Sequence, residues 1–147
     1  FIHQTGKEER EKIEQIYKEY GFDAEIFDFS SNISGFYRQS HFIISRAGAM
    51  TVTEILYLRI PALFIPYPYA IYDHQTKNAE FAQNLGCAMM YREKDIDKNL
   101  LASILNKLYE NPQKLLEMSQ KACLFKLNNP CKKIIDIIWE EMCIKEI

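Results

Sequence analysis

The chain has 147 residues with a formal net charge of −2, and 48% of its residues are hydrophobic while 26% are charged. This composition is typical of a folded globular domain and excludes a disordered chain; five glycines and five prolines are too few for a collagen-like or linker-like sequence. The near-neutral charge gives no reason to expect a nucleic-acid partner, and no run approaches the roughly 18 apolar residues of a membrane span.

Hydrophobic periodicity alternates between that of strands and that of helices along the chain. In chain order we expect a strand at residues 1–3, a helix at 7–20, a strand at 24–29, a helix at 33–39, a strand at 41–44, a helix at 50–58, a strand at 62–65, a helix at 74–85, a strand at 87–91, and helices at 97–109, 113–123 and 130–145. This alternation predicts an α/β fold, with a Rossmann-like parallel sheet and helices on both of its faces.

Ligands of such sheets bind in the loops that follow the carboxyl ends of strands. Three of these loops carry unusual polar residues, and they follow His3, Ile44 and Ile65. A lone histidine such as His3 is more often a structural residue than a ligand contact, and both interpretations stay open. The other two loops have stronger patterns.

The loop after Ile44 reads Ser-Arg-Ala-Gly-Ala at residues 45–49 and leads into a helix. Free N–H groups and the dipole at a helix start favour a phosphate, and Gly48 lets a ligand approach the backbone closely. Glu54 follows one turn later, at a position suited to a ribose diol. Two structural alternatives stay open, because Thr51 and Glu54 also fit a capping box and Arg46 can pair with a surface carboxylate.

The loop after Ile65 leads into a helix whose start reads Asp-His-Gln-Thr-Lys-Asn at residues 73–78. His74 and Asn78 are four residues apart and share a helix face, with Gln75 beside them. Imidazole and amide groups suit sugar hydroxyls, because they can donate and accept hydrogen bonds. The alternative is an ordinary polar helix start with Asp73 as its N-cap.

The sequence predicts no metal site. Asp95 and Asp97 match the D-x-D pattern of some metal–diphosphate sites, but their position before a late helix favours helix capping. The three histidines and four cysteines do not cluster at metal-ligand spacing. We expect the cysteines to be reduced, buried thiols; they are Cys87, Cys123, Cys131 and Cys143.

Four segments together resemble the C-terminal half of the MurG family, the bacterial peptidoglycan N-acetylglucosaminyltransferases. The segments occur in the order and at the spacing of that family, and they are residues 3–7 (HQTGK), 45–54 (SRAGAMTVTE), 61–66 (PALFIP) and 73–79 (DHQTKNA). The resemblance covers residues 1 to about 140. It implies the C-terminal domain of a two-domain GT-B glycosyltransferase whose active site lies between the domains.

The resemblance also implies a reaction and its partners. The enzyme would transfer GlcNAc from UDP-GlcNAc to the lipid-linked muramoyl-pentapeptide lipid I, forming lipid II for peptidoglycan. The C-terminal domain would hold the donor, and the N-terminal domain would meet the membrane and the acceptor. The protein would lie peripherally on the cytoplasmic face of the bacterial inner membrane, with these residues soluble by themselves, and would need no cofactor.

The resemblance places the nucleotide part of the donor on the segment at residues 45–54. Glu54 would bind the ribose hydroxyls. Ala49, Met50 and Thr51 would present backbone or hydroxyl groups to the diphosphate, with Arg46 nearby.

The sugar and the base would contact other segments. His74 and Gln75 would meet the GlcNAc hydroxyls, and Asn78 would brace their loop. The chain around Phe29 and Ser30 would pair its backbone with the uracil edge. His74 departs from the family pattern, where another polar residue such as glutamine is common at this position.

Two parts of the family are expected to lie outside these residues. The glycine-rich loop and first strand of the donor domain should precede Phe1, and the whole N-terminal domain should come before them. Residues 1–147 would then be one donor-binding domain, incomplete at its N-terminus, with no catalytic residue of its own.

We expect no signal peptide, because no basic segment followed by an apolar segment occurs near the start of these residues.

Two alternatives stay open. Another GT-B-type enzyme acting on a UDP-sugar, an epimerase or a hydrolase, would share the donor residues and differ in the acceptor. A nucleotide-sugar-binding subunit, as in two-subunit eukaryotic transferases, would work with a separate membrane partner. A reading frame that begins close to Phe1 favours the subunit, and a MurG-like half upstream favours the transferase.

Overall fold

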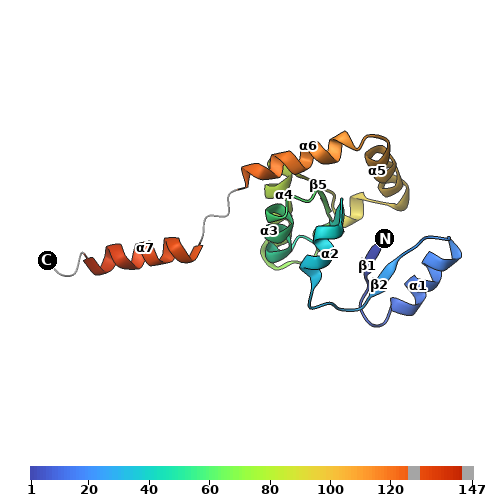
Figure 1. The fold of residues 1–147 in the computed structure, drawn as a ribbon, viewed down its shortest axis with the longest axis horizontal. Coiled ribbons are helices and arrows are strands. Elements are labelled where there is room, and N and C mark those ends of the chain that lie inside the picture. The colour runs from blue at the N-terminus through green and yellow to red at the C-terminus, as the bar shows by residue number, and fades with distance from the viewer. Residues whose placement is uncertain (126–129, 144–147) are drawn as a thin grey trace. The chain divides into compact units, whose positions relative to one another are not determined.

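The computed structural model describes residues 1–125 and 130–143 and divides the chain into two compact units (Figure 1). The first unit is residues 1–40, and the second begins at His41. Strands and helices alternate from Ile2 to Glu110, and every strand pair in the described residues is parallel. The predicted α/β class with parallel strand pairing is therefore confirmed.

The first unit contains β1 (Ile2–Gln4), α1 (Arg10–Glu19), β2 (Glu25–Phe27) and α2 (Ile33–Gln39). Strand β1 pairs with β2, and the register sets His3 opposite Ile26. The α1 helix is followed by Gly21, whose φ of +69° is an angle that glycine adopts readily. Phe27 of β2 stacks on Phe36 of α2, with ring centroids 4.6 Å apart.

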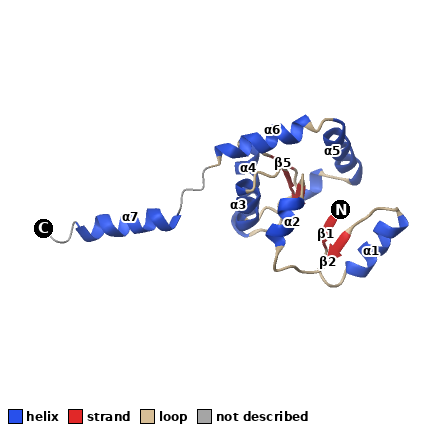
Figure 2. Cartoon of the chain, viewed as in Figure 1, coloured by secondary structure: helices blue, strands red, loops and turns tan. Residues whose placement is uncertain are grey.

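The second unit contains a three-stranded sheet in the order β3-β4-β5. Figure 2 colours strands red and helices blue. Its strands are β3 (Ile43–Ser45), β4 (Ala62–Phe64) and β5 (Ala88–Met90). Its helices are α3 (Ala49–Tyr57), α4 (His74–Asn84), α5 (Lys98–Glu110), α6 (Gln113–Lys121) and α7 (Pro130–Cys143), and short 3₁₀ turns lie at Ile71–Asp73, Glu93–Asp95 and Ala122–Leu124. Among the described residues, no helix is long and apolar enough to cross a membrane.

The core of the second unit is built around β4. Leu63 and Phe64 have no exposed surface, as expected for a central strand that neighbouring elements cover on both faces. Helix α3 buries Val52, Ile55 and Leu56. This packing fixes the carboxyl end of β4, from which the loop to α4 departs.

Replacing Leu63 by alanine is expected to lower the free energy of unfolding by about 2–5 kcal/mol, because it leaves a cavity in a fully buried position. Urea denaturation followed by circular dichroism measures this change. Leu116→Ala is the control, since Leu116 is 50% exposed and should lose under about 1 kcal/mol. Equal losses of unfolding free energy in the two variants would contradict the conclusion that the core is built around β4.

The predicted elements agree with the observed ones, with shifts of up to three residues at their ends. The first helix begins at Arg10 rather than residue 7, and α3 begins at Ala49 rather than residue 50. The last helix is confirmed as far as Cys143, and residues 144–147 lie outside the described part. The 3₁₀ turn at Ile71–Asp73 was not predicted, and it interrupts a segment expected to be loop.

The described cysteines differ in exposure. Cys87 is 1% exposed, and burial raises the pKa of its thiol, a shift that its backbone hydrogen bond partly opposes. Cys123 is exposed, so the expectation of a buried thiol is confirmed for Cys87 and wrong for Cys123. The side chains of Cys131 and Cys143 lie outside the described part.

A thiol-specific reagent at pH 8 is expected to label Cys123 at least tenfold faster than Cys87. The thiolate is the reactive form, and burial both hides Cys87 and keeps it protonated. Mass spectrometry of proteolytic fragments after timed labelling distinguishes the two sites. If Cys123 and Cys87 of the native protein were labelled at equal rates, and both more slowly than in urea, the predicted difference in exposure would be contradicted.

Candidate functional site

The start of α3 presents free backbone donors. Gly48 is the N-cap and supplies no side-chain hydrogen bond to the helix. Within the described residues, the N–H groups of Ala49, Met50 and Thr51 have no hydrogen-bond partner. Three unpaired N–H groups at the positive end of a helix make this point suited to an anion. Thr51 lies inside the helix and is not its N-cap, so the capping-box alternative is wrong.

A pocket of about 290 Å³ lies beside this helix start, and Ala49, Met50, Thr53 and Glu54 line it. The Glu54 side chain is half-buried and makes no hydrogen bond or ion pair in the part of the chain that is described. Its carboxylate is therefore available to accept hydrogen bonds from a ligand's hydroxyl groups.

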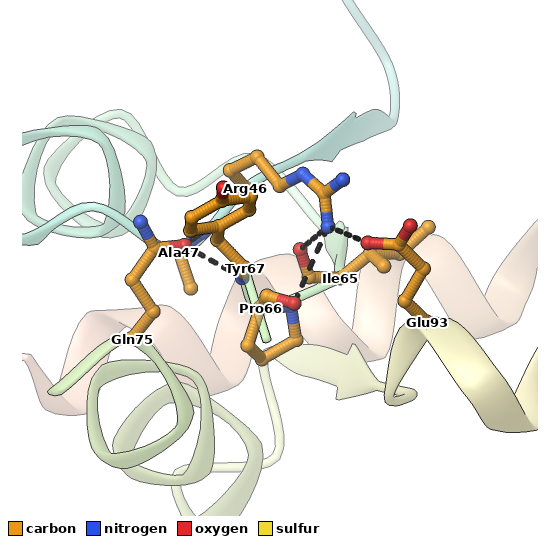
Figure 3. A network of polar contacts seen from close by, with 7 residues as sticks. All are labelled: Arg46, Ala47, Ile65, Pro66, Tyr67, Gln75 and Glu93. Atoms are coloured by element: carbon orange, nitrogen blue, oxygen red, sulfur yellow. Dashed lines mark hydrogen bonds and ion pairs between the residues drawn. The ribbon is translucent and has the colours of Figure 1, made fainter. Parts of the chain in front are cut away.

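Two side chains of α4 hold the loop that precedes α3. Ala47 is completely buried, and both of its backbone groups are paired. Its N–H donates to Gln75 Oε1 at 3.2 Å, and its carbonyl oxygen accepts from Asn78 Nδ2 at 3.0 Å. Gln75 Oε1 also accepts from the Tyr67 N–H at 3.0 Å, so one side chain ties together the loops after β3 and β4 (Figure 3).

This arrangement orients the Gln75 side chain. Because Oε1 receives two backbone N–H groups, the amide nitrogen Nε2 is the part left to meet a ligand, and within the described residues Nε2 has no partner. Asn78 braces the loop after β3, whereas the resemblance implied bracing of its own loop. Gln75 and Asn78 therefore both hold the protein backbone, whether or not they also contact a ligand.

Arg46 joins the ends of all three strands of this sheet. Its Nη1 donates to the carbonyl oxygens of Ile65 and Pro66 and to Glu93 Oε2, the last at 2.7 Å (Figure 3). Its guanidinium carbon lies 5.6 Å from the centre of the Tyr67 ring, within cation–π range. The alternative in which Arg46 pairs with a surface carboxylate is thus confirmed, and a role at the diphosphate stays a prediction.

The start of α4 has a strained backbone. Tyr72 and Asp73 both have φ of +54°, an angle rarely adopted by residues other than glycine. Asp73 is the N-cap by position, but its side chain accepts from the Thr76 hydroxyl rather than from a backbone N–H. His74 is exposed, and its Nδ1 lies 2.6 Å from the Ile71 carbonyl oxygen. Nδ1 therefore donates there and leaves Nε2 toward solvent.

The remaining predicted contacts lie in the first unit. Ser30 is half-buried, and its hydroxyl oxygen accepts from the Asn32 N–H at 3.0 Å. His3 is half-buried, with Nδ1 3.2 Å from the Tyr17 hydroxyl and the rings packed edge to face. His3 therefore has the partner expected of a structural histidine. Burial raises the pKa of Tyr17, so its hydroxyl stays protonated and can donate to His3.

Glu93, which anchors Arg46 from the turn after β5, was not predicted from the sequence. Forty-seven positions separate the two residues, and no local spacing rule connects them. Asp97 caps α5 by accepting from the Leu100 N–H at 2.7 Å, which confirms the capping interpretation of that D-x-D segment. Within residues 1–125 and 130–143, no three histidine, cysteine or acidic side chains are grouped to hold a metal ion.

Known proteins similar to this chain in sequence belong to one family of glycosyltransferases. The sequence profile of the glycosyltransferase family 28 C-terminal domain matches residues 1–136. Relatives named UDP-N-acetylglucosamine–N-acetylmuramyl-(pentapeptide) pyrophosphoryl-undecaprenol N-acetylglucosamine transferase include one from Myxococcus xanthus, 34% identical over 137 residues. Another, from Campylobacter fetus, is 43% identical over 100 residues. These matches cover 93% and 68% of the chain but only 36% and 30% of the relatives.

Solved structures show the same likeness. MurG of Acinetobacter baumannii superposes with a TM-score of 0.85 at 30% identity, over 95% of this chain and 42% of that one. The glycosyltransferase of kitacinnamycin shares the fold alone, with a TM-score of 0.52 at 17% identity. Its match covers 69% of this chain and 26% of that one.

The chain is thus an α/β glycosyltransferase domain with the C-terminal fold of the GT-B class. It belongs to glycosyltransferase family 28, as its C-terminal domain, and the resemblance to MurG is confirmed. The chain spans little more than a third of the relatives from Myxococcus xanthus and Hahella chejuensis.

Proposed function

We propose that this chain is the donor-binding domain of an N-acetylglucosaminyltransferase that transfers GlcNAc from UDP-GlcNAc to lipid I and so forms lipid II. The observation that carries the proposal is the helix start at Ala49, where three free N–H groups adjoin a pocket containing an unpaired Glu54. An anion site beside a free carboxylate suits a diphosphate joined to a ribose diol.

Gly48 supports the same proposal. Its backbone angles, φ −62° and ψ 146°, are open to any residue. A Cβ at this position would lie 3.6 Å from Thr51 Oγ1, which is an ordinary contact. Folding alone therefore does not require glycine here, whereas a phosphate approaching the helix start would benefit from the missing side chain.

The proposed chemistry is stabilisation of the leaving group. As the bond between the sugar and the β-phosphate breaks, negative charge grows on the phosphate oxygens. Fixed N–H dipoles at the start of α3 would stabilise that charge without reorganising, and no metal or cofactor is part of the proposal. Gln75 would position the GlcNAc through its free Nε2, with His74 nearby. No residue of this chain is proposed as the general base.

The acceptor and the cellular location belong to the same proposal. An N-terminal domain of the same protein would supply the catalytic base, bind lipid I and contact the cytoplasmic face of the inner membrane. The relatives' names, which specify an undecaprenol-linked acceptor, support this, as does their greater length.

The test is product analysis with the full-length protein, UDP-[¹⁴C]GlcNAc and lipid I in detergent. Radiolabel that moves into a lipid-extractable product supports the proposal. UDP-ManNAc formed without an acceptor indicates an epimerase, and free GlcNAc indicates a hydrolase. Transfer that requires a second, separately encoded subunit indicates the two-subunit alternative.

A further inference from the structure

A second pocket, of about 480 Å³, lies between the loop after β4 and the turn after β5. Pro66 and Asp73 line it from the first segment, Thr76 from the first turn of α4, and Arg92, Glu93 and Lys94 from the second segment. Both segments follow the carboxyl ends of parallel strands, where ligands of such sheets bind. None of these six residues was predicted to contact the donor.

The charges in this pocket are unevenly paired. Glu93 is bound to Arg46 at 2.7 Å, and Asp73 accepts a hydrogen bond from the Thr76 hydroxyl. By contrast, the side chains of Arg92 and Lys94 make no hydrogen bond or ion pair within the described residues. Asp73 keeps its negative charge, because a hydroxyl donor does not neutralise a carboxylate, whereas Arg46 balances the charge of Glu93. Arg92 and Lys94 together exceed the charge of Asp73 by one positive charge, so the pocket suits an anion.

One wall of the pocket is held in place before any ligand arrives. Asp73 is locked in a left-handed conformation, and its N–H donates to the Ala70 carbonyl oxygen at 3.0 Å. Thr76 is only 6% exposed. Arg46 donates to both the Pro66 carbonyl oxygen and Glu93, so it links the two sides of the pocket (Figure 3). A preformed site needs little ordering when a ligand binds.

The position of the pocket indicates which substrate it serves. The first turn of α4 carries His74 and Gln75, proposed to meet the donor sugar, and also Asp73 and Thr76, which line this pocket. The nucleotide end of the donor is instead assigned to α3, around Glu54. In a transfer reaction the acceptor approaches the sugar end, because the bond forms at the sugar carbon.

We propose that this second pocket binds an anionic group of the acceptor, either a carboxylate of its peptide or a phosphate, through Arg92 and Lys94. The inference rests on the proposed function, and it adds to this domain a contact with the acceptor as well as the donor. Both kinds of anion occur in the acceptor that the relatives' names describe, a pyrophosphoryl-linked muramyl pentapeptide.

The kinetic test uses the full-length protein carrying Arg92→Glu and Lys94→Glu together. The KM for lipid I is expected to rise at least tenfold, while the KM for UDP-GlcNAc stays within twofold. The matched control compares Lys94→Glu with Lys98→Glu, which makes the same charge change on a lysine outside the pocket lining. An unchanged KM for lipid I, or an equal rise in the KM for the donor, overturns the inference.

A binding measurement separates the inference from the proposed function. Isotope-labelled full-length protein is titrated with muramyl pentapeptide and, separately, with inorganic pyrophosphate, while the NMR signals of Arg92 and Lys94 are followed. Shifts with the peptide identify a carboxylate, and shifts with pyrophosphate alone identify a phosphate. No shift of the Arg92 and Lys94 signals with either compound overturns the inference, even if GlcNAc transfer is observed. Shifts of another lining residue, Thr76, that persist unchanged in the double variant also overturn it.

Discussion

Replacing Gln75 by glutamate is expected to weaken UDP-GlcNAc binding about tenfold or more while leaving the free energy of unfolding within about 1 kcal/mol of wild type. A carboxylate oxygen can still accept from the N–H groups of Ala47 and Tyr67, as Oε1 of Gln75 does now. The substitution replaces the Nε2 donor, which is the group proposed to meet the sugar, by a charged oxygen that cannot donate and that also repels the diphosphate of the donor.

Gln75→Met provides the contrast. Methionine removes the acceptor as well and leaves the N–H of the buried Ala47 without a partner, so about 1–3 kcal/mol of stability should be lost in addition to donor affinity. Calorimetric titration and thermal unfolding of the two variants separate the roles. If Gln75→Glu binds the donor as tightly as wild type, Gln75 only braces the loops.

Replacing Glu54 by alanine is expected to reduce UDP-GlcNAc affinity by about 10- to 100-fold, because hydrogen bonds to a charged group contribute roughly 1.5–3 kcal/mol. The carboxylate has no partner within the described residues, so its removal should change the melting temperature by no more than about 2 °C. Titration calorimetry on the wild-type protein and the variant measures the affinity.

The control for Glu54 is Glu80→Ala on α4. Glu80 is exposed and does not line the pocket at the start of α3, yet its substitution makes the same change in net charge. The affinity of the Glu80→Ala variant for UDP-GlcNAc should stay within twofold of the wild-type affinity. A similar loss in both variants would assign the effect to overall charge rather than to a contact with the ribose.

The helices and strands could be predicted because their signals are local. The apolar run of β4 between two prolines and the helical spacing of α1 each lie within a few residues. The strained turn at Tyr72 and Asp73 could not be predicted from the sequence. Neither residue type prefers a positive φ strongly enough for its presence to indicate one. The Thr51–Glu54 pattern fitted a capping box, but the helix begins earlier, at Ala49.

The candidate site was predictable in its residue types and less so in its contacts. Glu54 lies on α3 and lines the pocket at the start of that helix, and its contact with the donor stays a prediction. The bond of Arg46 to Glu93 and the double role of the Gln75 oxygen join segments far apart in sequence, so only the folded structure shows them. Ser30 lies in the first unit, and its proposed contact with uracil stays a prediction.

The most direct measurement is a calorimetric titration of the wild-type protein with UDP-GlcNAc, set beside titrations with UDP-GalNAc and UDP. We expect UDP-GlcNAc to bind at least tenfold more tightly than UDP-GalNAc, since the two differ only in the orientation of one sugar hydroxyl near the proposed Gln75 contact. Equal affinities would mean that sugar specificity lies outside these residues. If the full-length wild-type protein bound none of these three nucleotides, that result would contradict the account of this domain as the donor site.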